Sequence, residues 1–389
     1  MTLRSLLFTG LVALGLAAFG GGASVTSPPG ATASGTLRVS LTDAPACGYD
    51  AVFVTIERIR VHQSSSAGEG EAGWSEIVLD PARRVDLLQL SNGVLESLGQ
   101  TALPAGRYQQ LRLVLAPNTP ANPLANAVVP TGGKETALST PSGQTSGLKL
   151  NVDLVVAADK VLDVVIDFDA CKSVVKRGNS GQYNLKPVLS VMPVLSDAGL
   201  RVVGQVAAEQ AAGTTVSLQL AGVPVKTTAP AANGSFTLYP VPPGTYDLVI
   251  SGGGRITAVI TGVPVVSTAY TVINAPLTSI TRPVATLRAV TGTVKPTSAG
   301  VRALQSLTVG PTIEVAWMTV DDSSGAFSSS LPIEAPWRAV FAPAANTIVF
   351  TPDSAAAGLY TIEASSGTAS QRQAIDVRSP VPPLAFNLP

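Results

Sequence analysis

Residues 233–250 read NGSFTLYPVPPGTYDLVI, residues 324–341 read SGAFSSSLPIEAPWRAVF, and the two stretches align without a gap. The matching positions are Gly234 and Gly325, Phe236 and Phe327, Tyr246 and Trp337, and Val249 and Val340, with Gly204 and Val206 matching Gly292 and Val294 upstream. In each copy a Gly turn leads into a strand, a Pro-containing corner follows, and an aromatic residue opens the return strand. We therefore expect two related β-sandwiches, over residues 199–280 and 285–389, each near the usual size of about 100 residues.

The chain before this repeat also has the pattern of an all-β domain. From Thr36 onward, short runs of β-branched and apolar residues alternate with Gly, Pro and Asn turns, and no long segment has a helical period. The strands predicted for a first domain, residues 36–195, are Leu37–Leu41, Ala51–His62, Trp74–Leu79, Gln109–Ala116, Leu148–Val156, Val161–Phe168 and Leu185–Val194. Val85–Leu98 has some helical character but is broken at Asn92-Gly93, and residues 117–147 are predicted to form an extended surface loop. The predicted fold class is all-β, with three consecutive β-sandwich domains after a signal peptide.

The composition argues against several classes of function. Charged residues make up 13% of the 389 residues, and Lys+Arg and Asp+Glu number 25 each, so the formal net charge is zero. Proteins that bind nucleic acid carry a basic surface, so no nucleic-acid partner is expected. One His and two Cys are too few for zinc fingers or iron–sulfur cages.

The N-terminus has the features of an export signal. Arg4 precedes an apolar run from Leu6 to Phe19 that is too short to span a bilayer but suits a signal-peptide core. We predict a signal peptide over residues 1–23 and a flexible linker over residues 24–35, with no transmembrane segment in the mature chain. Residues 16–20 resemble a bacterial lipoprotein box in which Phe19 replaces the lipidated Cys, so the mature chain is expected to carry no lipid. The predicted location is the periplasm, the outer cell envelope or the extracellular space.

An acidic strand holds the first candidate site. Alternation in a strand places Asp163, Asp167 and Asp169 on one face and the apolar residues between them on the other. Carboxylates this close need a cation or basic partners. The leading interpretation is a salt-bridge ladder with the nearby bases Arg112, Lys149 and Lys186. A Ca²⁺ site formed by Asp43, Asp167 and Asp169 is the second interpretation, and an acid–base pair is the third.

The two cysteines are the second candidate. In an oxidising compartment Cys47 and Cys171 permit one disulfide, and two separate buried thiols are the alternative. A catalytic thiol would need the single histidine, His62, which is expected at the surface end of a strand. No Gly-x-Ser-x-Gly motif is present, so the chain is not expected to be an enzyme.

Ordered motifs in the first domain carry a resemblance to a known family. They are Leu41-Thr42-Asp43-Ala44-Pro45, Val52–Thr55 with Trp74, Pro104–Tyr108, Gly147–Leu150, Asp167-Phe168-Asp169-Ala170 and Tyr183–Leu189. With them the domain resembles a bacterial lipoprotein domain of unknown function, family 4382. Residues 199–280 look like the carboxypeptidase-regulatory, transthyretin-like sandwich through Gly204-x-Val206, Asn233–Phe236 and Pro243-Gly244-Thr245-Tyr246. These resemblances imply immunoglobulin- or transthyretin-like sandwiches, and for the second domain a non-catalytic accessory role.

The function expected from the sequence is that of an exported, non-enzymatic binding or adhesion-type protein. Its partner would be a cell-surface or matrix component of unknown identity, and its C-terminal sandwiches would act as spacers. The alternatives are a structural assembly subunit without a ligand, a Ca²⁺-dependent binder, or a hydrolase accessory domain that uses the acidic cluster. No cofactor is expected apart from the possible Ca²⁺.

Overall fold

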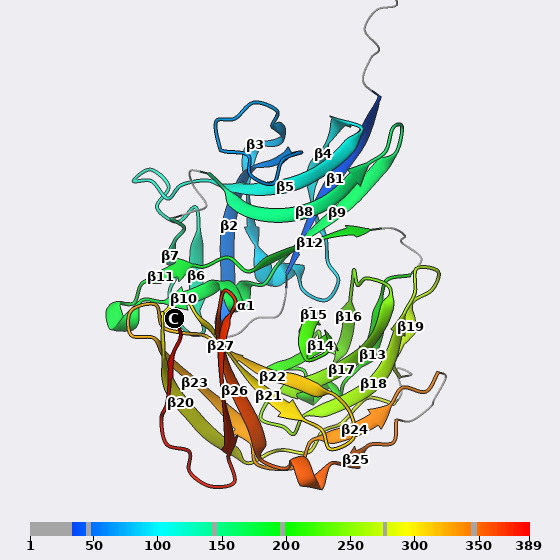
Figure 1. Cartoon of the computed structure of the whole chain (residues 1–389), viewed down its shortest axis with the longest axis vertical. Coiled ribbons are helices and arrows are strands. Elements are labelled where there is room, and N and C mark those ends of the chain that lie inside the picture. The colour runs from blue at the N-terminus through cyan, green and yellow to red at the C-terminus, as the bar shows by residue number, and fades with distance from the viewer. Residues whose placement is uncertain (1–32, 44–47, 142–145, 195–198, 275–277, 344–347) are drawn as a thin grey trace, which may run out of the picture. The chain divides into compact units, whose positions relative to one another are not determined.

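The strands of the described residues fall into three pairs of sheets, each pair enclosing an apolar core (Figure 1). The computed structural model describes residues 33–43, 48–141, 146–194, 199–274, 278–343 and 348–389. The predicted signal peptide, residues 1–23, and most of the predicted linker lie outside these residues. Within the described residues the chain is nearly all β, as the sequence predicted, and contains no helix long and apolar enough to cross a membrane. Residues 33–389 form one compact unit.

The first pair of sheets spans residues 34–194. One sheet has the order β12-β9-β1-β4, and the other has the order β10-β11-β7-β6-β2-β5-β8, with β3 paired to β2. The strands are β1 (Ser34–Asp43), β2 (Tyr49–His62), β3 (Ser75–Asp86), β4 (Glu96–Pro104), β5 (Gly106–Leu115), β6 (Ala127–Pro130), β7 (Thr136–Ser139), β8 (Leu148–Val156), β9 (Val161–Phe168), β10 (Val174–Lys176), β11 (Tyr183–Leu185) and β12 (Leu189–Val194). The short helices are η1 (Leu87–Leu90), α1 (Ala170–Ser173) and η2 (Gly178–Ser180).

Two predictions for this domain need correction. The segment 117–147 is not only a surface loop, because it contains β6 and β7 and buries Asn126 and Val128. The polar Asn126 is buried because its side chain bonds the backbone of Thr55 at 3.0 Å and of Ala116 at 2.7 Å. The helical stretch at 85–98 shrinks to the single turn η1, which Asp86 caps by accepting a hydrogen bond from the Leu88 amide.

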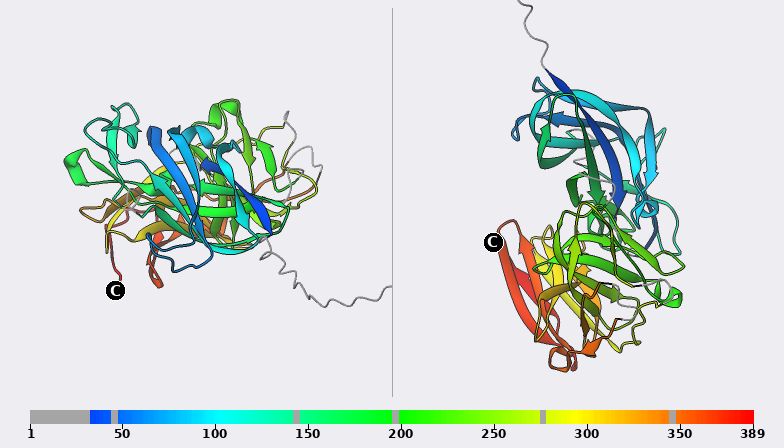
Figure 2. Two further views of the ribbon diagram at one scale, coloured as in Figure 1. Left: turned by 90° about the horizontal axis from the view of Figure 1, so that it is seen from above. Right: turned by 90° about the vertical axis from the view of Figure 1, so that its right-hand side faces the viewer.

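The second and third pairs of sheets share one strand order. The second comprises β13 (Val202–Gln205), η3 (Ala208–Gln210), β14 (Thr214–Leu220), β15 (Val223–Thr228), β16 (Ser235–Leu238), β17 (Gly244–Gly252), β18 (Ala258–Val265) and β19 (Thr271–Val272). The third comprises β20 (Leu287–Lys295), β21 (Gly300–Ser306), β22 (Thr312–Met318), β23 (Ala326–Pro332), η4 (Ser354–Ala356), β26 (Leu359–Ser366), β27 (Ala369–Asp376) and β28 (Leu384–Asn387). The orders β16-β13-β19 and β15-β14-β17-β18 correspond strand by strand to β23-β20-β28 and β22-β21-β26-β27. The same strands can be followed from two further directions in Figure 2.

Matching glycines in the two sandwiches make room for a buried phenylalanine. Gly204 lies opposite Phe236 in the β13–β16 pair, and Gly292 lies opposite Phe327 in the β20–β23 pair. A Cβ atom on either glycine would lie 2.3 Å from the ring of that phenylalanine, which is too close for two carbon atoms. The repeat seen in the sequence at these positions therefore has a packing cause.

The third sandwich contains one insertion that the second lacks. Its strands β24 (Trp337–Val340) and β25 (Thr351–Pro352) leave the third sandwich and extend the sheet of the second, where β24 pairs in parallel with β18. The predicted equivalence of Tyr246 and Trp337 is therefore wrong. Tyr360 on β26 takes the place of Tyr246, since both hydroxyls donate to a proline carbonyl, that of Pro242 at 2.9 Å and that of Pro332 at 2.8 Å.

Candidate functional site at the junction of the three sandwiches

The short helix α1 brings charged side chains of the first sandwich to the junction with the other two. Asp169 caps this helix, because its Oδ1 accepts a hydrogen bond from the Lys172 amide at 3.0 Å. The same carboxylate lies 3.3 Å from the Lys172 ammonium through Oδ2. Asp169 thus ends strand β9 and fixes the direction in which Lys172 extends.

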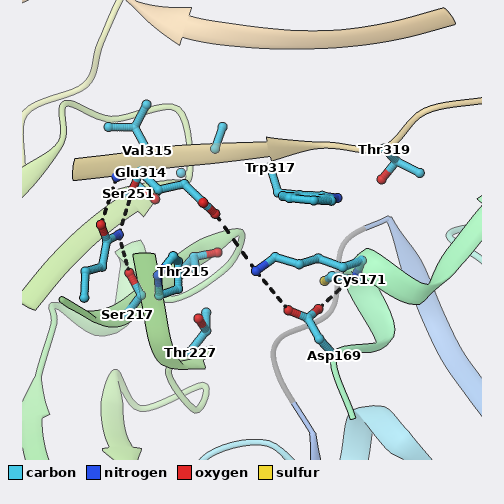
Figure 3. A pocket seen from close by; sticks show the side chains of 15 residues that line it. Asp169, Cys171, Thr215, Ser217, Thr227, Ser251, Glu314, Val315, Trp317 and Thr319 are labelled. Carbon is cyan, nitrogen blue, oxygen red and sulfur yellow. Dashed lines mark hydrogen bonds and ion pairs between the residues drawn. The ribbon is translucent and has the colours of Figure 1, made fainter. Parts of the chain in front are cut away.

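Lys172 begins a row of alternating charges that continues into the third sandwich. Its Nζ lies 4.0 Å from Oε1 of Glu314 on β22 and 5.2 Å from the ring centre of Trp317. Glu314 in turn lies 3.4 Å from Arg302, whose guanidinium also pairs with Glu363 at 2.6 Å. Figure 3 shows Asp169 and Glu314 on opposite sides of the pocket, joined by dashed lines through the lysine between them. Opposite charges therefore neutralise one another across the junction.

Glu314 is a buried carboxylate of this row, at 8% exposed. Burial raises the pKa of Glu314, and the neighbouring Lys172 and Arg302 offset only part of that rise. Its backbone is held by the second sandwich, because the Gln219 side-chain amide donates to the Glu314 carbonyl at 2.8 Å and accepts from its N–H at 2.8 Å. The three sandwiches therefore meet at Glu314.

A pocket of 230 Å³ lies at this meeting point. Figure 3 shows the hydroxyl side chains of Thr215, Ser217, Thr227 and Ser251 on one side and Trp317 on the other. The lining combines neutral hydroxyls with a lysine and two carboxylates that are already paired. Such a lining can donate to and accept from a small polar molecule, and it contains no nucleophile paired with a histidine base.

The structure gives the three carboxylates of the predicted Ca²⁺ site separate protein partners. Asp43 is 1% exposed and accepts a hydrogen bond from the Ala170 amide at 2.9 Å. Asp167 lies 2.9 Å from Lys226 of strand β15, and Asp169 is occupied with Lys172. Among the described residues no group of three Asp, Glu, His or Cys side chains could hold a metal ion. The Ca²⁺ set stays a prediction, and these partners argue against it.

Asp163 and Asp167 lie on one face of strand β9, called the acidic face here. The bases that neutralise it differ from those that the sequence suggested. Asp163 pairs with Arg38 of the neighbouring strand β1, and Asp167 pairs with Lys226. Val165, on the same face between the two aspartates, is 2% exposed, so this face is covered at its middle. The suggested bases have other roles. Arg112 donates to the Ser146 and Ala67 carbonyls, and Lys186 pairs with Asp322 of the third sandwich.

The other residues singled out in the sequence lie in different places. Cys47 falls outside the described residues, so its disulfide with Cys171 stays a prediction. The Asp43–Ala170 hydrogen bond supports it, because it joins the segments that precede the two cysteines. His62 was predicted to lie at the surface, but it is buried, at 9% exposed. Its ring nitrogens form hydrogen bonds with the Ala72 carbonyl and the Ser64 amide.

Sequence reasoning missed Lys226, Glu314 and Trp317. A signal for the first two was present, since each is a charged residue within a run of β-branched and apolar residues (VPVKTT and TIEVAWM). Charged side chains in such runs are buried only with partners, so they mark contact surfaces. Trp317 gave no comparable signal, because an aromatic residue in a strand is ordinary core.

Comparison with known proteins adds one finding about the first sandwich. No curated protein matches this sequence. Among solved structures, the chain is similar to the Bacillus anthracis TIE protein, with 9% identity and a TM-score of 0.17 over 91% of this chain and 50% of that chain, so it spans half of that chain. It is also similar to the Corynebacterium diphtheriae major pilin SpaA, with 10% identity and a TM-score of 0.18 over 91% of this chain and 99% of that chain. Likenesses this low carry no argument about this protein. Residues 34–187, in contrast, match the family model described as a domain of unknown function (DUF4382).

Proposed function

We propose that this is an exported, non-enzymatic protein of the cell envelope with a structural or adhesion-type role, in which three sandwiches act as one body. The observation that carries the proposal is that polar side chains of the first-domain motifs bind residues of another sandwich. Asn184 and Lys186 of the motif at residues 183–189 both bind Asp322 of the third sandwich, the former at 2.7 Å. These side chains hold domains together and do not converge on a substrate cleft.

The contact with the third sandwich is polar and extensive. The Gly178 amide donates to Asp321 Oδ2 at 2.7 Å, and the Asp322 amide donates to the Lys176 carbonyl at 2.9 Å. Burial by itself would raise the pKa of Asp322, but the bonds from Lys186 and Asn184 outweigh it and lower that pKa. The ionised carboxylate of Asp322 is thus stabilised by its partners in the first sandwich.

The contact with the second sandwich uses a turn and a buried ion pair. The turn residue Asn92 donates its amide to Thr228 Oγ1 at 2.8 Å and accepts the Thr237 amide at 2.5 Å. Lys226, 3% exposed, reaches Asp167. The C-terminal sandwiches therefore cover faces of the first domain, which modifies the expectation that they are simple spacers.

Other parts of the proposal rest on the sequence alone. Export rests on the N-terminal segment, and the absence of catalysis rests on the lack of a nucleophile and base pair in the sequence. The lipoprotein-like origin of the first domain and the transthyretin-like kinship of the second belong to the proposal as well. The partner would be a cell-surface or matrix component.

Calorimetry of the full chain tests whether the sandwiches act as one body. We expect a single cooperative transition, because each sandwich has polar contacts with the other two. Asp322→Ala should split off a lower transition for the third sandwich. The matched control is Asp376→Ala, which removes an aspartate whose partner, Arg378, lies in the same sandwich. Separate transitions in the unaltered chain would contradict the proposal and restore the spacer hypothesis.

Cell fractionation tests export, and binding to envelope material tests the adhesion-type role. The protein should appear in the envelope or medium fractions, and purified protein should bind isolated envelopes of the producing cells in a saturable manner. Protein confined to the cytoplasm would refute export. Full-length protein that is exported but does not bind would favour the structural alternative.

A second candidate function is binding of a small polar ligand in the junction pocket, favoured by its hydroxyl lining. A thermal-shift screen of sugars and amino acids tests this function. A hit should be weakened by Ser251→Ala, which alters the lining at a hydroxyl that is outside the charge row. No shift with any compound would remove this candidate.

A further inference from the structure

The second sandwich has a sheet edge that is completed by a strand from another part of the chain. Strand β18 occupies the end of its sheet in the same position as β27 in the third sandwich. Among the described strands of the third sandwich none lies beyond β27, whereas β18 receives β24. The shared strand order shows that β24 is an addition to the sandwich and not one of its own strands.

The added strand is held by backbone hydrogen bonds. The Trp337 amide donates to the Thr257 carbonyl and the Phe341 amide to the Thr261 carbonyl, each at 2.8 Å. The parallel register runs from Ala258 opposite Trp337 to Thr261 opposite Val340. Such pairing recognises an extended backbone, which is the usual way a free sheet edge binds a strand.

Apolar side chains of the same insertion pack against the core of the second sandwich. Trp337, Phe341, Ile348 and Phe350 lie against that core, and the rings of Trp337 and Phe350 stack with centres 6.0 Å apart. Without the insertion, the β18 edge would expose unpaired backbone groups beside apolar surface. An edge of this kind associates with any strand of matching pattern.

We propose that the β18 edge also accepts strand β24 from a second copy of this chain, so that copies assemble by exchanging the third sandwich. This inference goes beyond the proposed function and does not depend on the compartment in which the protein acts. The partner is a second copy because its β24 offers the same register and the same apolar side chains as the strand now bound. Exchange of one element between copies conserves every contact and is a common route to oligomers.

The strand moves together with the third sandwich. Glu334, just before β24, accepts hydrogen bonds from the Thr286 amide at 3.0 Å, and Ile333 donates its amide to the Thr286 carbonyl at 3.0 Å. Thr286 immediately precedes β20, the first strand of the third sandwich. The base of β24 is therefore fixed to its own sandwich, and the whole sandwich is the exchanging element.

Mass action decides whether β24 pairs with β18 of its own chain or with β18 of a second copy. The contacts are the same within one chain and between chains, so the balance depends on protein concentration against the effective concentration of the tethered strand. For a short connection that effective concentration is about millimolar. We therefore expect monomers in dilute solution and exchanged assemblies after refolding at high concentration.

Cysteine pairing between chains tests the inference. Thr261 and Val340 are register partners, so Thr261→Cys in one chain and Val340→Cys in another are held side by side for a disulfide when β24 crosses between copies. Equal amounts of the two variants are unfolded together, refolded at high concentration and oxidised. The control replaces Val340→Cys with Val155→Cys, another valine of similar exposure, 66% against 71%.

The inference predicts disulfide-linked heterodimers from the first mixture well above the level of the control mixture. Equal yields from the two mixtures would overturn it. The double variant Thr261→Cys/Val340→Cys should form an internal bond when refolded in dilute solution. If it does not, the β18–β24 register is wrong and the inference fails with it. Neither result bears on export or envelope binding, which are measured separately.

Discussion

Replacing Lys226 with methionine tests whether the acidic face is neutralised by a buried ion pair. The Lys226 side chain is 2% exposed and that of Asp167 is 15% exposed, with Nζ and Oδ1 2.9 Å apart. Methionine keeps the length and apolar packing of the lysine stem but removes its charge. Asp167 would then remain partly buried without its cation.

The expected loss follows from the burial of the two partners. At this separation and an effective dielectric constant of about 20, the Coulomb attraction is about 6 kcal/mol, most of which offsets desolvation. Removing one partner of a buried pair costs about 3–5 kcal/mol. The loss of unfolding free energy for Lys226→Met should lie near the lower end of this range, at about 3 kcal/mol, because Asp167 keeps some contact with water. Asp167→Asn should cost more, since it leaves the more deeply buried ammonium unpaired.

Equilibrium unfolding in urea measures these losses, and the double variant Asp167→Leu/Lys226→Met replaces both charged side chains with apolar ones. The double variant should regain most of the stability, because two apolar side chains need no neutralisation. The control is Arg107→Met, which breaks an exposed pair with Asp153 and should stay close to the unaltered protein.

Two results would refute the reasoning. A loss for Lys226→Met no larger than that of the control would show that the pair is solvated. A rise in melting temperature with millimolar Ca²⁺ that Asp167→Asn abolishes would show that a cation, and not Lys226, neutralises the face.

Three further predictions concern other parts of the chain. Gly204→Ala should cost about 1–3 kcal/mol in urea unfolding, because its Cβ would overlap Phe236, and Phe236→Leu should recover part of the loss; an unchanged midpoint would contradict this packing. Burial raises the folded pKa of Glu314 above 4.5, so the folded state binds the proton more tightly than the unfolded state does. Glu314 should therefore lower the free energy of unfolding as pH rises from 4.5 through the folded pKa. The difference in stability between the unaltered protein and Glu314→Gln should show this slope, and parallel pH profiles of the two proteins would exclude it. Non-reducing peptide maps should recover Cys47 joined to Cys171, and full thiol labelling of unreduced, denatured protein would disprove the bond.

Strands that pair only with strands of their own sandwich could be predicted from the sequence. The bounds of β8 and β9 agree with the predicted Leu148–Val156 and Val161–Phe168, because a two-residue period ends on each side at turn residues. The same reasoning did not predict which sheet the strand at Trp337 joins. An aromatic residue after a Pro-containing corner begins a strand in either sandwich, and only the long-range pairing with β18 reveals which sheet it joins.

The acidic face shows the same limit at the candidate site. The alternation of Asp163 and Asp167 with buried apolar residues followed from strand geometry, and the need for basic partners followed from electrostatics. The partner of Asp167 lies 59 positions away on another sandwich, and no local pattern indicates that pair. Asp169 departs from the strand pattern because it caps α1 instead of continuing β9.

The insertion also means that strand β18 is synthesised before the strand that covers its edge. At about 5–20 residues per second, several seconds pass between synthesis of β18 and synthesis of β24, the strand that covers its edge. The half of β18 that β24 never reaches has its own protection, since Gly262 has a positive φ of 75° and Pro264 has no amide to offer a neighbour. The other half, Ala258–Thr261, lacks such residues, so a chain stopped between the two strands would present an adhesive edge. Truncations that end before residue 337 should therefore aggregate more than the full-length chain.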